Sequence, residues 1–275
     1  MSNFQERQDR FITYLSRSGK TKETGNIYRN LVKNYFRFWD NPEVEVSEER
    51  IAFFLNALKE SKYAAGYIGS TKYALKAYCA ANQIPWQEGT YLFPIKSRDD
   101  ERVFQPAFSL DQVGKLIRAV KKEEVTKGYL FLISLYGLRQ NEAIKVKEED
   151  IDFNKKTIFI KTSKGGEKRE HLLPDIAKKF IDIDFKAKSH VDMKYHFGYI
   201  CKLAGVEIKK GYGWHAIRRS LVTELFNLGH RSDQIEIFLR WSNKSRMVNR
   251  YNVPDLLRLD REILGNHPFL KFWEE

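Results

Sequence analysis

The sequence predicts a mainly α-helical fold with one small antiparallel β-sheet. Apolar residues recur at helical spacing through most of the chain, whereas the stretch 151–174 changes to strand-like alternation. Between residues 83 and 108 neither period is present, and three prolines accompany a charged run. A length of 275 residues also favours two domains over one. We therefore predict a helical domain over residues 1–82, a linker over 83–105 and a second domain over 106–275.

The first domain is predicted to consist of helices. Ser47, followed by two glutamates, is typical of a helix N-cap with acidic residues in the first turn. A further helix is expected over residues 64–81. The apolar residues that set the helical spacing before it are Phe4, Phe11, Ile12 and Leu15, then Ile27, Leu31, Tyr35 and Phe38, then Ile51, Phe54, Leu55 and Leu58.

The second domain is predicted to begin with a capping box. Ser109 and Gln112 have the spacing of that motif and open a helix over residues 110–121. An apolar helix follows over residues 129–136. Alternating residues around Ile158 and Ile160, followed by Gly165-Gly166, predict two strands joined by a tight turn. Helical spacing returns from Trp214 and is closed by Gly229.

Positive charge is concentrated in the second domain. The chain carries 48 Lys+Arg against 36 Asp+Glu, a formal net charge of +12. Residues 1–100 contribute +3 and residues 101–275 contribute +9, of which +6 falls within residues 202–250. A local excess of this kind predicts a binding face for an acidic partner such as nucleic acid.

Several classes of protein are excluded by what the sequence lacks. Cys79 and Cys201 stand alone, so no disulfide framework or Cys-x-x-Cys metal site is predicted. No secretory signal, membrane-spanning run, phosphate-binding loop, HExxH or GxSxG motif is present. The six histidines lack a ligand spacing. We expect a cytoplasmic protein that uses no cofactor and no metal and does not bind a membrane.

Polar residues at predicted element boundaries form a second set of candidates. Arg139 follows an apolar helix and Gly137, and Glu142 three residues on is placed to fix its guanidinium. Lys164 lies at the tip of the hairpin, and His215 and Arg218 share one helix face. Each also has an ordinary reading, as a solvated helix cap, a loop lysine or a chance pair. The same holds for Trp241 and Tyr251, which are also typical of core packing.

Taken in order, these candidates resemble the active site of the tyrosine recombinases, also called phage-type integrases. The residues that carry the resemblance are Arg139, Lys164, His215, Arg218, Trp241 and Tyr251. Their local contexts match as well, because Arg139 stands in Gly-Leu-Arg-x-x-Glu and His215 opens His-Ala-Ile-Arg. The motifs cover residues 106–255. Residues 1–82 resemble the family's SAM-like core-binding domain in kind only.

The resemblance implies a mechanism. Tyr251 would attack a DNA phosphate to form a 3′-phosphotyrosyl link, which conserves bond energy so that rejoining needs neither ATP nor metal. Arg139 and Arg218 would stabilise the charge on the non-bridging oxygens, and the indole N–H of Trp241 would also donate to the phosphate. Lys164 would protonate the leaving 5′ oxygen and His215 would assist proton movement at the tyrosine.

The stretch from Arg240 to Tyr251 departs from the family pattern in two ways. Trp241 and Tyr251 are ten residues apart, one more than is usual, and Arg240 replaces the usual glycine. Two alternatives therefore remain beside a site-specific recombinase. One is a type IB topoisomerase-like relaxation enzyme, and the other is a catalytically silent DNA-binding accessory protein.

The resemblance also implies partners. We expect double-stranded DNA bearing a specific recombination site, association with DNA in the cell, and a tetrameric synapse formed on that DNA. Residues 252–275 would then either pack on their own domain or dock on a neighbouring protomer. The expected role is DNA recombination or integration for a mobile genetic element.

Overall fold

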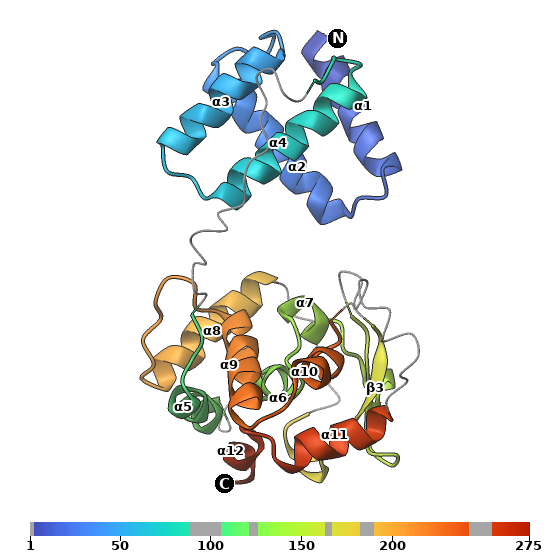
Figure 1. The fold of residues 1–275 in the computed structure, drawn as a ribbon, viewed down its shortest axis with the longest axis vertical. Coiled ribbons are helices and arrows are strands. Elements are labelled where there is room, and N and C mark those ends of the chain that lie inside the picture. Colours follow the sequence, from blue (N-terminus) through green and yellow to red (C-terminus); the bar gives the residue numbers. More distant parts are fainter. Residues whose placement is uncertain (1–2, 88–105, 121–125, 163–166, 182–189, 242–254) are drawn as a thin grey trace. The chain divides into compact units, whose positions relative to one another are not determined.

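The structure is a computed structural model that describes residues 3–87, 106–120, 126–162, 167–181, 190–241 and 255–275. The chain divides into two compact units, Met1–Val103 and Phe104–Glu275 (Figure 1). No helix among the described residues is long and apolar enough to span a membrane.

The described part of the first unit is built from four helices. They are α1 (Asn3–Arg17), α2 (Lys22–Phe38), α3 (Glu48–Glu60) and α4 (Ala65–Ala81). Thr21 caps α2 by accepting the Thr24 N–H at 3.2 Å, and Ser47 caps α3 by accepting the Arg50 N–H at 3.4 Å. Helix α4 contacts each of the other three.

Aromatic side chains fill the centre of this unit. Tyr78 of α4 meets Phe11 of α1 and Phe36 of α2 edge-on, with ring centroids 5.3 and 5.6 Å apart. Tyr35 meets Phe54 of α3 in the same way at 5.5 Å. These T-shaped pairs join all four helices into one core, which combines area burial with favourable ring geometry.

The second unit is mainly helical. Its described α-helices are α5 (Leu110–Val120), α6 (Lys127–Tyr136), α7 (Gln140–Ala143), α8 (His190–Leu203), α9 (Trp214–Asn227), α10 (Ser232–Phe238), α11 (Leu256–Gly265) and α12 (Leu270–Glu274). Two 3₁₀ turns, η1 (Glu148–Asp150) and η2 (Asp175–Lys179), flank the sheet in the chain. Ser109 and Gln112 form the expected capping box at the start of α5, with reciprocal bonds of 3.2 and 2.9 Å.

Three described strands form an antiparallel sheet in the order β1-β2-β3. They are β1 (Ile151–Asp152), β2 (Thr157–Ile160) and β3 (Arg169–Leu172). Arg169 and His171 of β3 are buried while Glu170 between them is exposed, as the two-residue period of a strand requires. Helix α11 packs against β3 (Figure 1).

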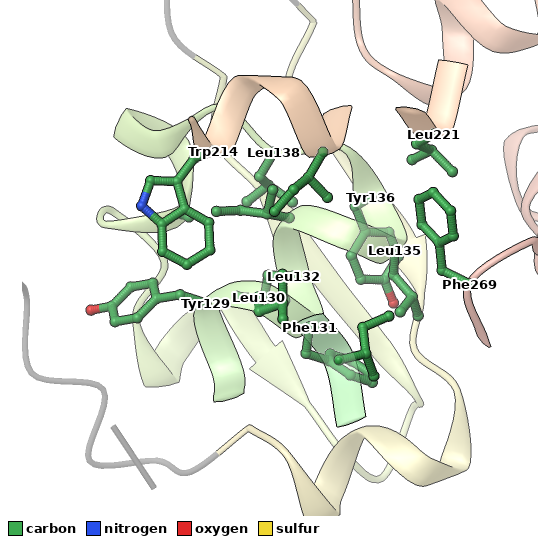
Figure 2. Packing of buried hydrophobic residues seen from close by; sticks show 14 of the residues in the cluster. Tyr129, Leu130, Phe131, Leu132, Leu135, Tyr136, Leu138, Trp214, Leu221 and Phe269 are labelled. Carbon is green, nitrogen blue, oxygen red and sulfur yellow. The ribbon is translucent and has the colours of Figure 1, made fainter. Parts of the chain in front are cut away.

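The core of the second unit surrounds α6. Every residue from Gly128 to Tyr136 is buried, because α5 and α9 both pack against this short helix. Figure 2 shows its side chains in one cluster with Trp214 and Leu221 of α9 and with Phe269. A helix that is apolar all round is expected in such a central position.

The C-terminal helix α12 packs on its own unit in this single chain. Trp273 is 1% exposed, donates its indole N–H to Ser134 Oγ at 3.1 Å and meets the Phe131 and Phe180 rings at 5.1 and 4.7 Å. Phe272 lies against Gly114 of α5, where an added Cβ would be 3.0 Å from the ring. This packing is one of the two arrangements expected for the end of the chain, and docking on a second protomer stays a prediction.

The predicted fold class is confirmed. The helices expected over 64–81, 110–121, 129–136 and from Trp214 are present, and Gly229 follows α9 in the left-handed conformation with φ 85°. The two expected strands are present as β2 and β3, which pair antiparallel, while the tight turn expected at Gly165-Gly166 lies outside the described residues. The sequence prediction missed the third strand, because β1 is only two residues long and offers no alternation to detect.

Removing the Trp273 side chain should destabilise the second unit. We expect Trp273→Ala to lower the free energy of unfolding by about 3–5 kcal/mol, since it opens a large cavity beside Phe131 and Phe180. Urea denaturation of the full chain measures this loss. The matched control is Glu274→Ala at the neighbouring exposed position, for which we expect a change within about 0.5 kcal/mol. Equal effects from the two variants would contradict the packing described.

Candidate active site

The first site element is the sharp turn that follows α6. Gly137 ends the helix in the left-handed conformation with φ 56°, and a Cβ there would stand only 2.5 Å from Leu239 Cδ2. Glycine is therefore required both for the backbone angle and for the close approach. Two residues later the chain starts α7 with Arg139 at its N-cap.

Glu142 fixes Arg139 from two sides. One carboxylate oxygen accepts the Arg139 backbone N–H at 2.8 Å, and the other accepts Nη1 of the same residue at 2.7 Å. The Glu142 side chain is fully buried, whereas that of Arg139 remains 27% exposed. The sequence prediction that Glu142 pairs with Arg139 is confirmed, and the guanidinium is aimed before any ligand binds.

Arg218 approaches the same turn from α9. It is 2% exposed, donates Nη1 to the Gly137 carbonyl and donates Nη2 to the Leu239 carbonyl at 3.0 Å. Its Nη1 also lies 3.9 Å from the Glu142 carboxylate. Two backbone carbonyls and one carboxylate thus hold the plane of this guanidinium.

His215 and Trp241 complete the group. His215 stands at the start of α9, three residues before Arg218, and is exposed. Trp241 follows α10, and the Arg218 guanidinium carbon lies 5.7 Å from the centroid of its ring, within cation–π range.

These four side chains line one pocket of about 360 Å³. The remaining lining residues are Ala107, Arg219, Val222 and Thr223. None of the described lining residues is an acid, so the pocket presents three guanidinium groups, an imidazole and an indole, while Glu142 contacts two of the guanidinium groups from outside the lining. Such a set suits an anionic ligand, and planar guanidinium forks match phosphate oxygens in particular.

Arg240 is a buried guanidinium directly behind the pocket. It follows Leu239, the C-cap of α10, and has the left-handed conformation with φ 58°, an angle that costs a non-glycine residue about 1–2 kcal/mol. Its side chain donates to the carbonyls of Phe238 and Tyr136 at 3.1 and 3.0 Å and lies 4.0 Å from Glu142. The residue that replaces the usual glycine is therefore part of the buried charge network.

Burial and neighbouring charges both shift the pKa values of this network. Burial raises the pKa of the Glu142 carboxyl, but the two hydrogen bonds from Arg139 and the charge of Arg240 outweigh it and leave the pKa lowered. Burial, with the charge of Arg139, lowers the pKa of Arg218 to about 10. Burial lowers that of Arg240 to about 9. At neutral pH all of these groups are charged.

Lys164 and Tyr251 lie outside the described residues. Of the six candidates from the sequence, the structure brings Arg139, His215, Arg218 and Trp241 together. Sequence reasoning missed Arg219, which lines the pocket and donates to the carbonyls of Pro106 and Gly211 at 2.7 and 2.9 Å. Its position next to Arg218 was the available signal. No group of three or more metal-ligating side chains is found in the described part of the chain.

Comparison with known proteins finds sequence similarity to the phage integrase family, whose model matches residues 107–184. Tyrosine recombinase XerA of Pyrococcus furiosus is 27% identical over 176 residues, which cover 60% of this chain and 56% of the relative. XerA of Pyrococcus horikoshii is 25% identical, and the match covers 61% of its length. XerA of Thermococcus kodakarensis is 24% identical over 266 residues, 89% of this chain and 90% of the relative. The match thus spans little more than half the length of the first two relatives.

Solved structures support the same fold. A lambda integrase tetramer bound to a Holliday junction superposes with a TM-score of 0.66 at 16% identity, over 90% of this chain and 76% of that one. The Tn1549 transposon integrase in complex with transposon right end DNA gives 0.61 at 17% identity, over 94% and 98%. The chain thus has the fold of these integrases, mainly helical with a small antiparallel sheet. In sequence it is similar to the tyrosine recombinases, or phage-type integrases.

Neutralising Glu142 should destabilise the protein strongly. We expect Glu142→Gln to cost about 3–5 kcal/mol of unfolding free energy, because it leaves the buried guanidinium groups of Arg218 and Arg240 without a counter-charge. Urea denaturation of the full chain measures this loss of unfolding free energy. Glu149→Gln is the matched control, since Glu149 pairs with lysines only at the surface and should cost less than about 1 kcal/mol. A small loss for Glu142→Gln would show that the three arginines do not depend on its charge.

Acidification should destabilise the second unit before the carboxylates titrate. Burial lowers the pKa of His171 to about 3 and that of His267 to about 4, so both rings stay neutral where unfolded histidines bind protons. The unfolded state then binds more protons, and stability falls as pH drops from about 6.5 towards 4. We expect a loss on the order of 2 kcal/mol for each histidine between pH 7 and pH 5.

Urea midpoints at pH 7 and pH 5 test this expectation. The variant His267→Phe should show a shallower pH dependence than the unmodified chain, because it removes one of the two groups. Equal stability of the unmodified protein at the two pH values would refute it.

Proposed function

We propose that the chain is a site-specific DNA recombinase that cleaves and rejoins strands through a 3′-phosphotyrosyl intermediate at Tyr251. The observation that carries the proposal is the pocket itself. Arg139 and Arg218 share one buried carboxylate and line a cavity together with His215 and Trp241, with no acid in the lining. These four side chains belong to the six candidates whose order along the chain resembles the active site of the tyrosine recombinases.

The two arginines would receive the scissile phosphate. Glu142 and backbone carbonyls already hold both guanidinium groups, so little reordering is needed when the phosphate binds. Fixed donors aimed at the non-bridging oxygens stabilise the charge that develops during attack at phosphorus. The Trp241 indole N–H would donate to the same phosphate, since an indole can donate but cannot exchange a proton as a histidine does.

The chemical step exchanges one phosphate ester for another. The Tyr251 phenol oxygen would bond to phosphorus while the bond from phosphorus to the 5′ oxygen breaks. The phenol proton would leave with the assistance of His215, and Lys164 would supply a proton to the departing 5′ oxygen. Attack by a 5′ hydroxyl on the phosphotyrosine reverses the step and needs no ATP or metal, because the ester bond is kept throughout. The roles of Lys164 and Tyr251 rest on the resemblance alone.

The partner would be duplex DNA with a specific site. Two of the similar solved structures are complexes with DNA, one of them a tetramer on a Holliday junction. By that likeness we propose that this chain also acts in a tetrameric synapse, with the helical unit 1–82 binding the core site. The net charge of +9 beyond residue 100 would contribute to backbone contact.

Trapping the covalent intermediate tests the proposal. Nicked duplexes with a randomised core, from which the freed strand dissociates after cleavage, are incubated with the protein and analysed under denaturing conditions. We expect an adduct on a subset of sequences, with the 3′ end attached to a peptide that contains Tyr251. Arg218→Lys should reduce the rate of adduct formation about 100- to 1,000-fold, the usual cost of losing a charge-stabilising donor at the transition state.

Matched tyrosine variants give the control. Tyr251→Phe should form no adduct, whereas Tyr195→Phe, which changes a 71%-exposed tyrosine of α8, should react like the unmodified protein. An adduct that persists in Tyr251→Phe would assign the nucleophile elsewhere, and no adduct on any duplex would favour an accessory protein. Relaxation of a plasmid that lacks every trapped sequence would favour the topoisomerase alternative.

A further inference from the structure

Two buried side chains of β3 connect the elements on either side of residues 242–254. Helix α10 and Arg240, two residues beyond its end, precede that segment in the chain, and α11 follows it. Arg169 and His171 point into the unit from alternate positions of β3 and are 6% and 0% exposed. Each of them contacts both flanks, and we call the pair the β3 bridge.

Arg169 makes the first connection. Its Nη1 donates to the Ile237 carbonyl of α10 at 3.4 Å, and its Nη2 donates to the Leu256 carbonyl at the start of α11 at 3.2 Å. Nη2 also pairs with the Asp260 carboxylate, which is fully buried. One guanidinium thus bonds to the helix before the segment and to the helix after it.

His171 makes the second connection. Its Nε2 lies 2.8 Å from Arg240 Nη1, and its Nδ1 lies 3.3 Å from Asp260 Oδ1 and 3.2 Å from Oδ2. A guanidinium can only donate, so Nε2 accepts and the proton resides on Nδ1, where it is donated to Asp260. The geometry therefore selects one tautomer and orders the bonds from Arg240 through His171 to Asp260.

This chain of bonds reaches the pocket. Arg240 Nη2 lies 4.0 Å from the Glu142 carboxylate that also holds Arg139 and Arg218. The Leu172 backbone N–H donates to Asp260 Oδ2 at 2.9 Å and ties α11 to the strand as well. The network is continuous from the arginines of the site to the helix that follows the segment.

Arg169, Arg240 and Asp260 are buried, and removing their charges from water costs free energy. Stability alone therefore does not explain why these charged residues are present. Replacing a buried ion pair by well-packed apolar residues is often neutral or stabilising, so such a network is weak evidence for a stabilising role. A satisfied network of directed bonds also holds the groups that it joins in one relative position. Here those groups are the two flanks of one segment and the arginines of the pocket.

We propose that the β3 bridge is a positioning device that fixes both flanks of residues 242–254 relative to Arg139 and Arg218, so that the nucleophile carried by that segment meets the bound phosphate. The inference rests on the proposed function, because the segment contains Tyr251. It assigns roles to Arg169, His171, Arg240 and Asp260 as positioning residues. DNA binding would not depend on them, but the rate of strand cleavage would.

The chain offers a matched pair of variants for the test. His171→Phe keeps an aromatic ring among Tyr136 and Phe238 but removes the two bonds that His171 contributes to the β3 bridge, to Arg240 and to Asp260. His267→Phe makes the same change at a second buried histidine, whose bonds within the described residues are to the Leu135 carbonyl and from the Phe269 N–H. Both variants lose two bonds of a neutral ring within the same unit. Because the His171 bonds are to charged groups, His171→Phe should lose more thermal stability, and unfolding is therefore measured for both variants.

The first measurement separates rate from affinity. On a duplex trapped by the unmodified protein, at a temperature where both variants are folded, we expect His171→Phe to lower the first-order rate of adduct formation about 10- to 100-fold, as a misplaced reacting group does. The dissociation constant for that duplex should stay unchanged. His267→Phe should retain the rate of the unmodified protein. Equal rates for the two variants, or a rate loss explained by weaker DNA binding, would overturn the proposal.

The second measurement does not depend on activity. Hydrogen exchange followed by mass spectrometry on the full chain without DNA should show faster exchange over residues 255–260 at the start of α11 in His171→Phe but not in His267→Phe. If exchange over these residues is the same in both variants, the β3 bridge is overturned. If the unmodified protein forms no adduct on any duplex, the proposed function fails, while the exchange result still decides whether the bridge fixes the start of α11.

Discussion

Glu142 is a single buried carboxylate that faces three guanidinium groups, and the arrangement of the second unit around the pocket depends on it. Arg139 bonds to it directly at 2.7 Å, and Arg218 and Arg240 lie 3.9 and 4.0 Å away. Three positive charges this close repel one another strongly at low dielectric, so they can be held together only around an acid. The net charge of this group is positive, with three guanidinium groups around one carboxylate. Under the proposed function, the scissile phosphate would supply the negative charge that the group lacks.

Much of this arrangement could be predicted from the sequence, because it is local. Arg139 and Glu142 are three residues apart at a helix start, and His215 and Arg218 are three apart on one helix. Such pairs meet whatever the rest of the fold does. The helical periods and capping residues likewise predicted α3, α5 and α9, since each signal lies within one or two turns of the element that it describes.

The rest could not be predicted, because it is made by residues far apart in the chain. His171 and Asp260 are separated by 89 residues, and no periodicity relates them. In the sequence Arg240 stands out only as the residue that replaces the family's usual glycine. In the structure its bonds to two carbonyls and to His171 compensate for a left-handed backbone angle. The bond to His171 joins residues 69 apart in the chain, so no local pattern could predict it.

The partners of the buried arginines have one more property in common. Arg218 bonds to the carbonyls of Gly137 and Leu239, Arg240 to those of Tyr136 and Phe238, and Arg169 to those of Ile237 and Leu256. A backbone carbonyl is present whatever side chain its residue carries, so most of these acceptors cannot be removed by substitution. The orientation of the guanidinium groups is thus determined by the positions at which the helices end. Sequence drift can replace most of the surrounding side chains and leave that aim intact, provided that the helix ends stay in place.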